Sequence, residues 1–497
     1  MPIEDIRSER IKKLEALRER GSDAYPAETA RTHPIAEIRK KFAVLSRTKK
    51  PVVAAGRVMA KREHGGAAFF DLRDASGSIQ ALAKEDILGE QYRLFLDTVD
   101  IGDFVEVSGA FFLTKKEEKT IEVHEWRMLA KSLRPLPEKW HGLQDVEERF
   151  RKRYLDLVMN DGVRERFQTR AAIIKTIRDF HEARGFLEVE TPMLHPIPGG
   201  ALARPFATHH NALNTDLYLR VAPELYLKRL LVGGYERVFE IGKSFRNEGI
   251  DAQHNPEFTM LESYAAYWDE SNMMGFVEDL FVGLAKKLNR KAGITVGNSQ
   301  LGNSVSNLET EFPSSAEGKK IIFKKPFGRI TFKDLLARYA LISDYDGETR
   351  ESLATRAKQF GIDIGAYESK AKIADEIYKK ICRPYLVQPT FVINHPLELS
   401  PLAKKRKENP DEVRRFQLIA GGVELTNGFS ELNDPIDQKE RFEAQEKERE
   451  RGEEEAMRID EDYVEALEYG MPPAAGLGIG IDRVVMLFTD TKNIREV

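Results

Sequence analysis

The chain has 497 residues, of which 41% are hydrophobic and 32% are charged, and its formal net charge is −4. This composition excludes a disordered or fibrous chain, and the length predicts two or three domains. No apolar run approaches the roughly eighteen residues that a membrane span needs, and the charged first twenty residues predict no secretory signal. The single cysteine, Cys382, cannot form an internal disulfide. We therefore expect a cytoplasmic protein.

The small net charge hides an asymmetry along the chain. Residues 1–145 carry a balance of +2 and the remainder carries −6. Between residues 31 and 62, ten Lys and Arg stand against one acidic residue, Glu37. This local excess predicts that a polyanion docks on the N-terminal part, and a solvated surface is the alternative.

The N-terminal third predicts a helix and then a small all-β domain. Residues 1–50 contain a charged helix over 3–20 and a basic lead-in. Five short strand-like runs separated by turns follow within 51–134, and they predict a closed barrel of the OB type. Such barrels bind single-stranded nucleic acid on aromatic side chains, and a barrel without a ligand is the alternative. Residues 135–150 begin with two prolines and predict a linker.

A larger α/β (α+β) domain is predicted over residues 151–497. Its insertions are expected near 290–326, which is rich in Gly, Ser and Asn, and near 340–385. Two strands are expected on either side of residue 250. Helices are expected over 164–184, 224–232, 270–289 and 435–469.

The hairpin predicted over residues 235–267 concentrates ionisable groups. Arg246 and Glu248 lie two apart, so we expect them on one side of an extended strand, with Glu262 and Tyr264 on the return strand. Burying this face is costly unless a ligand occupies it. A surface hairpin with cross-strand ion pairs is the alternative.

Two further segments are informative. Residues 474–490 place glycines before Asp482 and Arg483 at a predicted strand–helix junction, where an arginine suits a phosphate. Neither a P-loop nor a G-x-G-x-x-G fingerprint is present, which disfavours P-loop and Rossmann domains. Residues 185–194 predict a strand that ends at Pro192.

Together these three segments resemble the signature motifs of class II aminoacyl-tRNA synthetases. The matching residues are the segment around Pro192, the F-R-x-E run from Phe245 to Glu248, and the G-x-G-x-[DE]-R run that ends at Arg483. The resemblance implies a multidomain enzyme whose catalytic domain stands on an antiparallel sheet, and a homodimer formed through the segment around Pro192. A preceding OB-fold anticodon-binding domain is typical of the subgroup that charges lysine, aspartate or asparagine.

Several stretches are similar to lysyl-tRNA synthetases. They include R-V-A-P-E-L-Y-L-K-R-L at 220–230, H-N-P-E-F-T-M-L-E at 254–262 and N-G-F-S-E-L-N-D-P at 427–435. The implied activity is ATP-dependent conversion of L-lysine to lysyl-adenylate and transfer to the 3′ end of lysine tRNA. The alternatives are an aspartyl or asparaginyl enzyme, a relative that lysylates a protein, and a regulatory relative without catalysis.

The resemblance also implies a role for each matching position. Arg246 and Arg483 are the catalytic residues. The lysine-binding positions are Gly200, Glu224, Glu262, Tyr264, Asn427 and Glu431. The ATP-binding positions are Arg246, Glu248, His254, Phe258 and Arg483. The anticodon-binding positions are Arg62, Phe69, Gln80 and Glu125.

Magnesium is the cofactor that the resemblance implies, with Glu424 as a ligand. Gln417 occupies the second metal position, where the family usually has a glutamate. A neutral amide is a weaker ligand than a carboxylate, so the number of magnesium ions stays open.

Overall fold

The computed structural model describes residues 2–47, 52–137, 145–289, 294–295, 318–365, 368–452 and 455–497. The chain divides into two compact units, residues 1–159 and 160–497. Buried apolar clusters form a core in each unit. None of the described helices combines the length and the hydropathy that crossing a bilayer requires.

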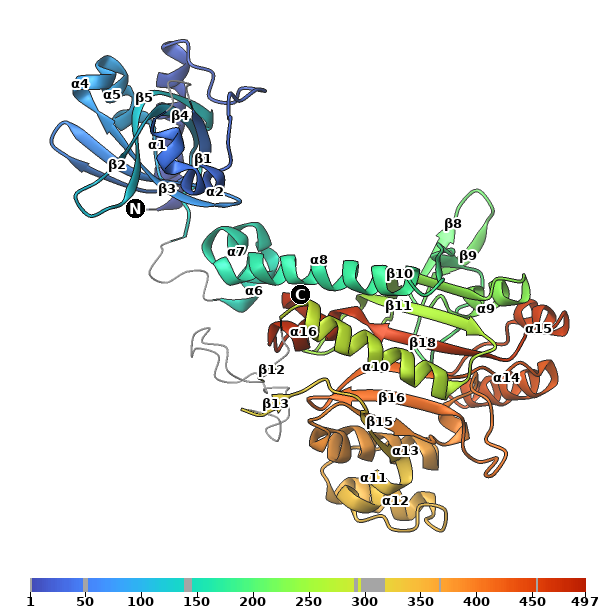
Figure 1. Cartoon of the computed structure of the whole chain (residues 1–497). Coiled ribbons are helices and arrows are strands. Elements are labelled where there is room, and N and C mark those ends of the chain that lie inside the picture. The colour runs from blue at the N-terminus through green and yellow to red at the C-terminus, as the bar shows by residue number, and fades with distance from the viewer. Residues whose placement is uncertain are drawn as a thin grey trace. The chain divides into compact units, whose positions relative to one another are not determined.

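A closed five-stranded barrel with strand order β1-β2-β3-β5-β4 forms the centre of the first unit, as the sequence predicted (Figure 1). Side chains alternate across its wall: Ala68 and Phe70 are buried inside, whereas Phe69 between them is half-buried on the outside. The strands are β1 (Val53–His64), β2 (Ala67–Asp74), β3 (Gly77–Lys84), β4 (Phe104–Leu113) and β5 (Lys119–Ala130).

Among the described helices of the first unit, the sequence predicted only the first. Helix α1 confirms the predicted first helix, but α4 and α5 between β3 and β4 were missed because this short segment lies among strand patterns. Phe95 of α5 is fully buried in the barrel core. The helices are α1 (Ile3–Glu19), α2 (Ile35–Lys40), α3 (Phe42–Leu45), α4 (Glu85–Leu88), α5 (Glu90–Thr98), α6 (Val146–Arg151) and α7 (Arg153–Met159).

Helix α6 begins inside the segment that was predicted to be a linker. The side chain of Asp145 accepts hydrogen bonds from the backbone N–H groups of Glu147 and Glu148, at 2.8 and 3.2 Å. This cap satisfies donors that the first turn of a helix leaves free, so a helix starts there. Residues 138–144 of the predicted linker lie outside the described residues.

An eight-stranded sheet with order β14-β15-β16-β17-β18-β11-β10-β6 supports the second unit. Its six central strands pair antiparallel, and only the edge pairs β14–β15 and β10–β6 are parallel, which confirms the predicted fold class. The strands are β6 (Leu187–Glu188), β10 (Arg237–Phe245), β11 (Glu257–Ala266), β14 (Gly328–Thr331), β15 (Thr390–Ile393), β16 (Arg415–Ala420), β17 (Val423–Ser430) and β18 (Ala474–Gly480).

Smaller strands complete this unit. A three-stranded sheet has the order β7-β9-β8, and a second small sheet pairs β12 with β13. Most of the insertion predicted near 290–326 lies outside the described residues. These strands are β7 (Leu194–His195), β8 (Ala207–His210), β9 (Thr215–Leu219), β12 (Ile294–Thr295) and β13 (Lys320–Ile321).

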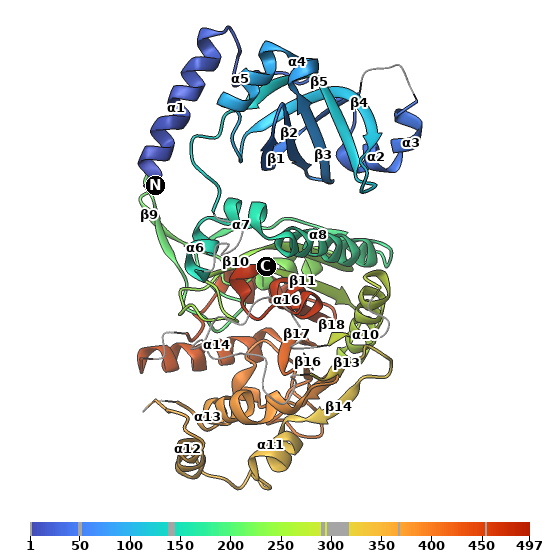
Figure 2. The same ribbon diagram turned by 90° about the vertical axis from the view of Figure 1, so that its left-hand side faces the viewer.

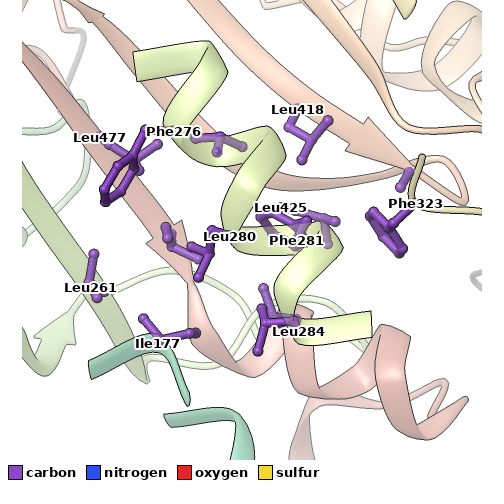
Figure 3. Close-up of a cluster of buried hydrophobic side chains, with 14 of the residues drawn as sticks. Ile177, Leu261, Phe276, Leu280, Phe281, Leu284, Phe323, Leu418, Leu425 and Leu477 are labelled. Carbon is purple, nitrogen blue, oxygen red and sulfur yellow. The ribbon is translucent and has the colours of Figure 1, made fainter. Parts of the chain in front are cut away.

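One face of the large sheet is covered by α8 (Asp161–Glu182), α10 (Glu270–Lys287) and α16 (Ile481–Thr489). In α10, Phe276, Leu280 and Leu284 recur at helical spacing and enter the core (Figure 3). Asp269 begins this helix with a capping box that it shares with Asn272. Because these helices cover this face with apolar side chains, a functional site on the sheet lies on the opposite face.

The opposite face of the sheet carries α9 (Glu224–Val232), α14 (Pro435–Glu450) and α15 (Glu461–Glu468), which pack together around Tyr264. The single helix predicted over 435–469 was wrong. Gly452 adopts a positive φ of 108°, and the side chain of Asp460 accepts a hydrogen bond from the N–H of Tyr463 at 2.9 Å. A break after one helix and a capped start of the next therefore divide the segment.

The insertion predicted near 340–385 contains helices. Helices α12 (Arg350–Gln359) and α13 (Lys370–Ile377) lie in it, and α11 (Phe332–Ala340) just precedes it; the three are grouped together in Figure 2. They enclose an apolar core of their own, to which Val392 of β15 also contributes. A π-helical turn, Tyr378–Cys382, continues α13. Cys382 is buried and free in this core.

Candidate active site

A cavity of about 660 Å³ opens on the face of the large sheet that α8, α10 and α16 do not cover. It brings together nearly all residues that the sequence predicted for lysine, ATP and metal binding. The predicted residues that line it are Gly200, Glu224, Arg246, Glu248, His254, Phe258, Glu262, Tyr264, Gln417, Glu424, Asn427 and Arg483.

The alternation of side chains along β11 separates this cavity from the core. Leu261 and Ala265 are fully buried against the helices on one face. Glu262 and Tyr264 point to the other face and line the cavity, where the Tyr264 hydroxyl donates a 2.8 Å hydrogen bond to Glu262. One strand thus supplies both the apolar core and the ionisable site.

Three buried carboxylates cluster at the cavity: Glu224 and Glu262 line it, and Glu431, which the sequence also predicted for lysine binding, is buried beside them and does not line it. Glu224, Glu262 and Glu431 expose only 6%, 4% and 2% of their surface. Burial, with the nearby negative charge of Glu224, raises the pKa of Glu262 to about 8. Burial also raises the pKa of Glu224 and of Glu431. Such a cluster favours a ligand that brings positive charge.

A fourth buried ion, Lys228, pairs with two of these carboxylates. Its Nζ lies 2.5 Å from Oε1 of Glu224 and also pairs with Glu431. Lys228 was not predicted from the sequence, although its position four residues after Glu224 on a predicted helix was a usable signal.

Two glycines make room for the side chains of this carboxylate cluster. Gly200 has a φ of +90°, and a Cβ there would lie 3.0 Å from the Cβ of Glu224. A Cβ on Gly476 would come within 2.1 Å of Oε1 of Glu431 and 2.5 Å of the Tyr264 ring. Any larger residue at position 476 would collide with the carboxylate cluster, which explains the glycine in this strand.

Arg246 and Glu248 lie just beyond β10, so the expectation that they share an extended strand was wrong. The strand ends at Phe245 because the N–H of Asn247 turns to donate to the carbonyl of Arg204 at 2.7 Å. Both side chains still line the cavity. The Arg246 guanidinium stands 5.1 Å from the centre of the Phe258 ring, and its buried Nε has no hydrogen-bond partner among the described residues. This arginine is therefore available to an anionic ligand.

Arg483, at the start of α16, is held by two hydrogen bonds that connect it through His254 to Asp251. Asp251 accepts a 2.7 Å hydrogen bond from Nδ1 of His254, and Nη2 of Arg483 donates to Nε2 of His254 at 3.1 Å. The carboxylate favours the tautomer with the proton on Nδ1, so Nε2 can accept. Asp251 was missed in the sequence, and its position three residues before His254 in a polar loop gave no strong signal.

The two predicted metal positions are adjacent, but they differ in orientation. Nε2 of Gln417 donates to Oε2 of Glu424 at 3.1 Å. Oε1 of Gln417 accepts hydrogen bonds from the Tyr378 hydroxyl and from His395, at 3.0 and 3.2 Å. Gln417 thus turns its oxygen away from Glu424 and fixes that carboxylate. The described residues contain no group of three His, Cys, Asp or Glu arranged to hold a metal ion.

Comparison with known proteins agrees with this geometry. Residues 145–497 match the family model described as tRNA synthetases class II (D, K and N), and residues 52–129 match one described as an OB-fold nucleic acid binding domain. The chain belongs to the class II tRNA synthetases. Lysine–tRNA ligase of Carboxydothermus hydrogenoformans is 49% identical over 489 residues, which are 98% of this chain and 96% of that protein.

Other relatives carry the same name. Lysine–tRNA ligase of Moorella thermoacetica is 47% identical over 493 residues, covering 99% of this chain and 96% of that protein. Lysine–tRNA ligase of Aquifex aeolicus is 49% identical over 450 residues, covering 90% and 72%. Within the class II synthetases, this chain therefore resembles lysine enzymes along nearly its whole length.

The barrel of this synthetase gathers three of the four predicted anticodon residues. Arg62, Phe69 and Leu82 are direct neighbours across β1, β2 and β3, and Gln80 lies two pairs further along β3, opposite Asp71. Thr120 donates a 2.9 Å hydrogen bond to Gln80. Glu125 lies on β5, five residues beyond Thr120 and thus roughly 17 Å along the strand, so the structure does not group it with the others.

The basic stretch over 31–62 contributes less free charge than its composition suggests. Arg31 pairs with Asp74, and Lys41 lies 2.6 Å from Glu37. Other members donate to backbone carbonyls of the barrel: Arg39 to Ser78, Arg57 to Gly102, and Lys61 to Leu96 and Val99. Lys40, Arg47 and Arg62 stay exposed. Much of the positive charge therefore stabilises the unit itself.

The wall formed by α13 and its π-helical turn was not anticipated from the sequence. It lines the cavity with charged side chains, among them Lys372, Asp375, Glu376 and Lys379. Lys379 pairs with Asp375 at 2.7 Å, and Lys372 lies 3.9 Å from Glu455, which also lines the cavity. No motif marked these residues, because the helices of an insertion come to the site only through tertiary packing.

Proposed function

We propose that this class II synthetase is a lysine–tRNA ligase, which activates L-lysine with ATP and transfers it to the 3′ end of lysine tRNA. In this proposal residues 51–134 bind the anticodon and residues 151–497 carry the catalytic site. The relatives that bear this name support the choice. It includes a cytoplasmic location, for which the single buried, free cysteine is the support.

The cluster of Glu224, Glu262 and Glu431 is the observation that carries the lysine assignment. Lysine brings two ammonium groups and one carboxylate. Glu224 and Glu262 line one cavity with Arg246, and Glu431 is buried beside these two acids. Glu262 would bind the α-ammonium beside Gly200, and Glu224 and Glu431 with Tyr264 would enclose the ε-ammonium. Asn427 is held beside them by a 2.8 Å hydrogen bond from Arg415.

The same polarity disfavours the alternatives. A site for aspartate needs a cation at the end of the side chain, whereas here that end is lined by carboxylates. A relative that lysylates a protein does not need an anticodon barrel, and the barrel is present. A regulator without catalysis would not need Arg246, Glu248 and Arg483 to line one cavity, as they do.

Positioning and charge neutralisation account for the first chemical step. The lysine carboxylate is already anionic, so its in-line attack on the α-phosphorus of ATP needs no general base. Arg246 would hold this carboxylate near the α-phosphate. Phe258 and Arg483 would flank the adenine, with Glu248 and His254 against the nucleotide. In the second step the 3′-terminal hydroxyl of the tRNA attacks the lysyl carbonyl, and AMP leaves.

One carboxylate fits magnesium here. Mg²⁺ usually keeps several waters and takes one or two protein carboxylates beside the phosphates, so Glu424 alone suffices. Gln417 orients Glu424 through its N–H, and this favours a supporting role over that of a ligand. When bound, the ion would neutralise charge on the phosphates of ATP.

A homodimer through the segment around Pro192 is also proposed. Pro192 is exposed, and its neighbours Met193 and Leu194 expose 46% and 45% of their surface. Leu187 of the edge strand β6 exposes 49%. Apolar groups of this kind beside a sheet edge are typical of a surface that a second copy covers.

The proposal is tested by amino-acid-dependent exchange of pyrophosphate into ATP, measured with each of the twenty amino acids. Lysine should support exchange and the others should not, because only lysine satisfies the buried carboxylates. Exchange with aspartate or asparagine would overturn the assignment. An absence of exchange with every amino acid would favour the regulatory alternative.

Glu431→Gln should raise the KM for lysine roughly 10- to 150-fold, because a charged hydrogen bond contributes about 1.5–3 kcal/mol. The KM for ATP should change little, and pyrophosphate exchange measures both. Glu443→Gln, an exposed glutamate on α14, is the matched control. An unchanged KM for lysine would remove Glu431 from the ammonium site.

Gln417→Glu should lower the magnesium concentration that gives half-maximal exchange, because it places a second carboxylate about 3 Å from Glu424. Glu424→Gln should raise this concentration. A magnesium titration of the exchange rate compares the two variants with the parent protein. If Gln417→Glu leaves the titration unchanged while Glu424→Gln shifts it, position 417 takes no part in metal binding.

Phe69→Ala should reduce tRNA charging while leaving adenylate formation intact, because stacking on one base is worth about 1–3 kcal/mol. Aminoacylation and pyrophosphate exchange are measured on the same preparation. Phe104→Ala is the control, since Phe104 also lies on the barrel but stacks under Arg57, 4.2 Å away. An equal loss of both activities would show that Phe69 supports only the barrel.

A further inference from the structure

Lys228 is an ammonium group sealed beneath the proposed lysine site. Its exposed surface is 0%, although a long charged side chain is rarely buried completely. It lies one turn after Glu224 on α9, and its Nζ stands 2.5 Å from Oε1 of that residue. The same Nζ pairs with Glu431 and lies 5.2 Å from the centre of the Phe429 ring.

The two carboxylates that Lys228 joins are the ones proposed to enclose the ε-ammonium of the substrate. Each carboxylate has two oxygens, so each can serve Lys228 and a second cation together. Oε1 of Glu431 has no hydrogen-bond partner among the residues that the structure describes. The ammonium of Lys228 therefore uses one oxygen of each of the two carboxylates, Glu224 and Glu431.

Electrostatics explains why such an ion is needed. Glu224, Glu262 and Glu431 are like charges in one buried cluster, so each makes it harder for the others to ionise. Burial opposes the charge of Lys228 too, but Glu224 and Glu431 outweigh it and raise the pKa of Lys228 above its ordinary value. Burial raises the pKa of Glu224 and of Glu431, and Lys228 opposes this rise, so it favours the ionised form of both carboxyl groups.

We propose that Lys228 is a positioning residue for lysine selection: its buried ammonium pairs with Glu224 and Glu431 and aims both side chains at the substrate ammonium. This inference rests on the proposed lysine site and adds a residue to it. Among the described residues, Lys228 is the ammonium that directly contacts this cluster of three carboxyl groups, and the ionised forms of these groups favour a second ammonium beside them. A side chain with an ammonium at its end meets that need, whereas a neutral side chain of the same length leaves buried charge unpaired.

The groups around Lys228 come from four parts of the fold. Glu224 lies on its own helix, Glu262 and Tyr264 come from β11, Phe429 from β17 with Glu431 just after it, and Tyr463 from α15. Arg415 on β16 is a further cation that acts on Glu224. Among these groups, Lys228 is the cation that contacts two of the carboxylates directly.

Lys228→Met tests the inference, because it keeps an unbranched chain of similar length and removes the charge. The KM for lysine should rise roughly tenfold or more at pH 7, while the KM for ATP stays within about twofold. Without the ammonium the carboxylates retain protons to higher pH, so the defect should shrink as the pH rises from 7 to 9. Lys228→Arg, which keeps the charge, should restore much of the parent pH profile.

Controls separate positioning from a merely structural role. Lys175→Met, on the exposed surface of α8, should change neither KM. If Lys228→Met does not fold, the double variant Lys228→Met, Glu431→Gln removes both members of one ion pair. The KM for lysine of the double variant should then exceed that of Glu431→Gln by less than tenfold, because the two substitutions remove the same ion pair.

The outcomes are distinguishable. If the parent protein shows no lysine-dependent exchange, the proposed function itself fails. If the parent uses lysine but Lys228→Met leaves the KM for lysine and its pH profile unchanged, only the role of Lys228 is overturned. The role of Lys228 would also be overturned if the KM for lysine of the double variant rose by the product of the effects of the two single substitutions. An equal rise in the KM for lysine and in the KM for ATP would overturn it as well.

Discussion

The alternation of side chains along the central antiparallel strands is the constraint on which the rest of the catalytic unit depends. Leu261 and Ala265 seal one face of β11 against helices, and this frees Glu262 and Tyr264 for the other face. A shift of the strand by one residue would exchange the two sets and place carboxylates in an apolar core. The nine residue pairs between β10 and β11 hold the register against such a shift.

Charge balance is the second constraint, and it follows from the first. Once several carboxylates share one buried face, the fold must offset their repulsion or let them take up protons. Lys228 offsets part of it, and the Tyr264 hydroxyl satisfies Glu262. The remaining deficit of positive charge is what makes the cavity selective for a cationic substrate. Stability and specificity thus depend on the same ion pairs.

Much of the fold and of the site was predictable from the sequence because the signals were local. The five barrel strands, α9 and the β10–β11 hairpin follow from residue patterns over short windows, and Arg246, Glu262 and Arg483 stand within ordered motifs. The errors fell where long-range contacts override local pattern. The hydrogen bond from Asn247 to Arg204 ends a strand early, and Asp460 starts a new helix where charge periodicity suggested continuity.

The sequence by itself determined the family, the barrel and the identity of most residues that line the cavity, since these depend on residue type and spacing. Only the tertiary structure decided how those residues pair. It joined Lys228 to both Glu224 and Glu431, turned the amide of Gln417 toward Glu424, and brought the α13 wall to the cavity. Glu224 and Glu431 are far apart along the chain, and an ion pair between distant residues depends on packing that no local pattern encodes.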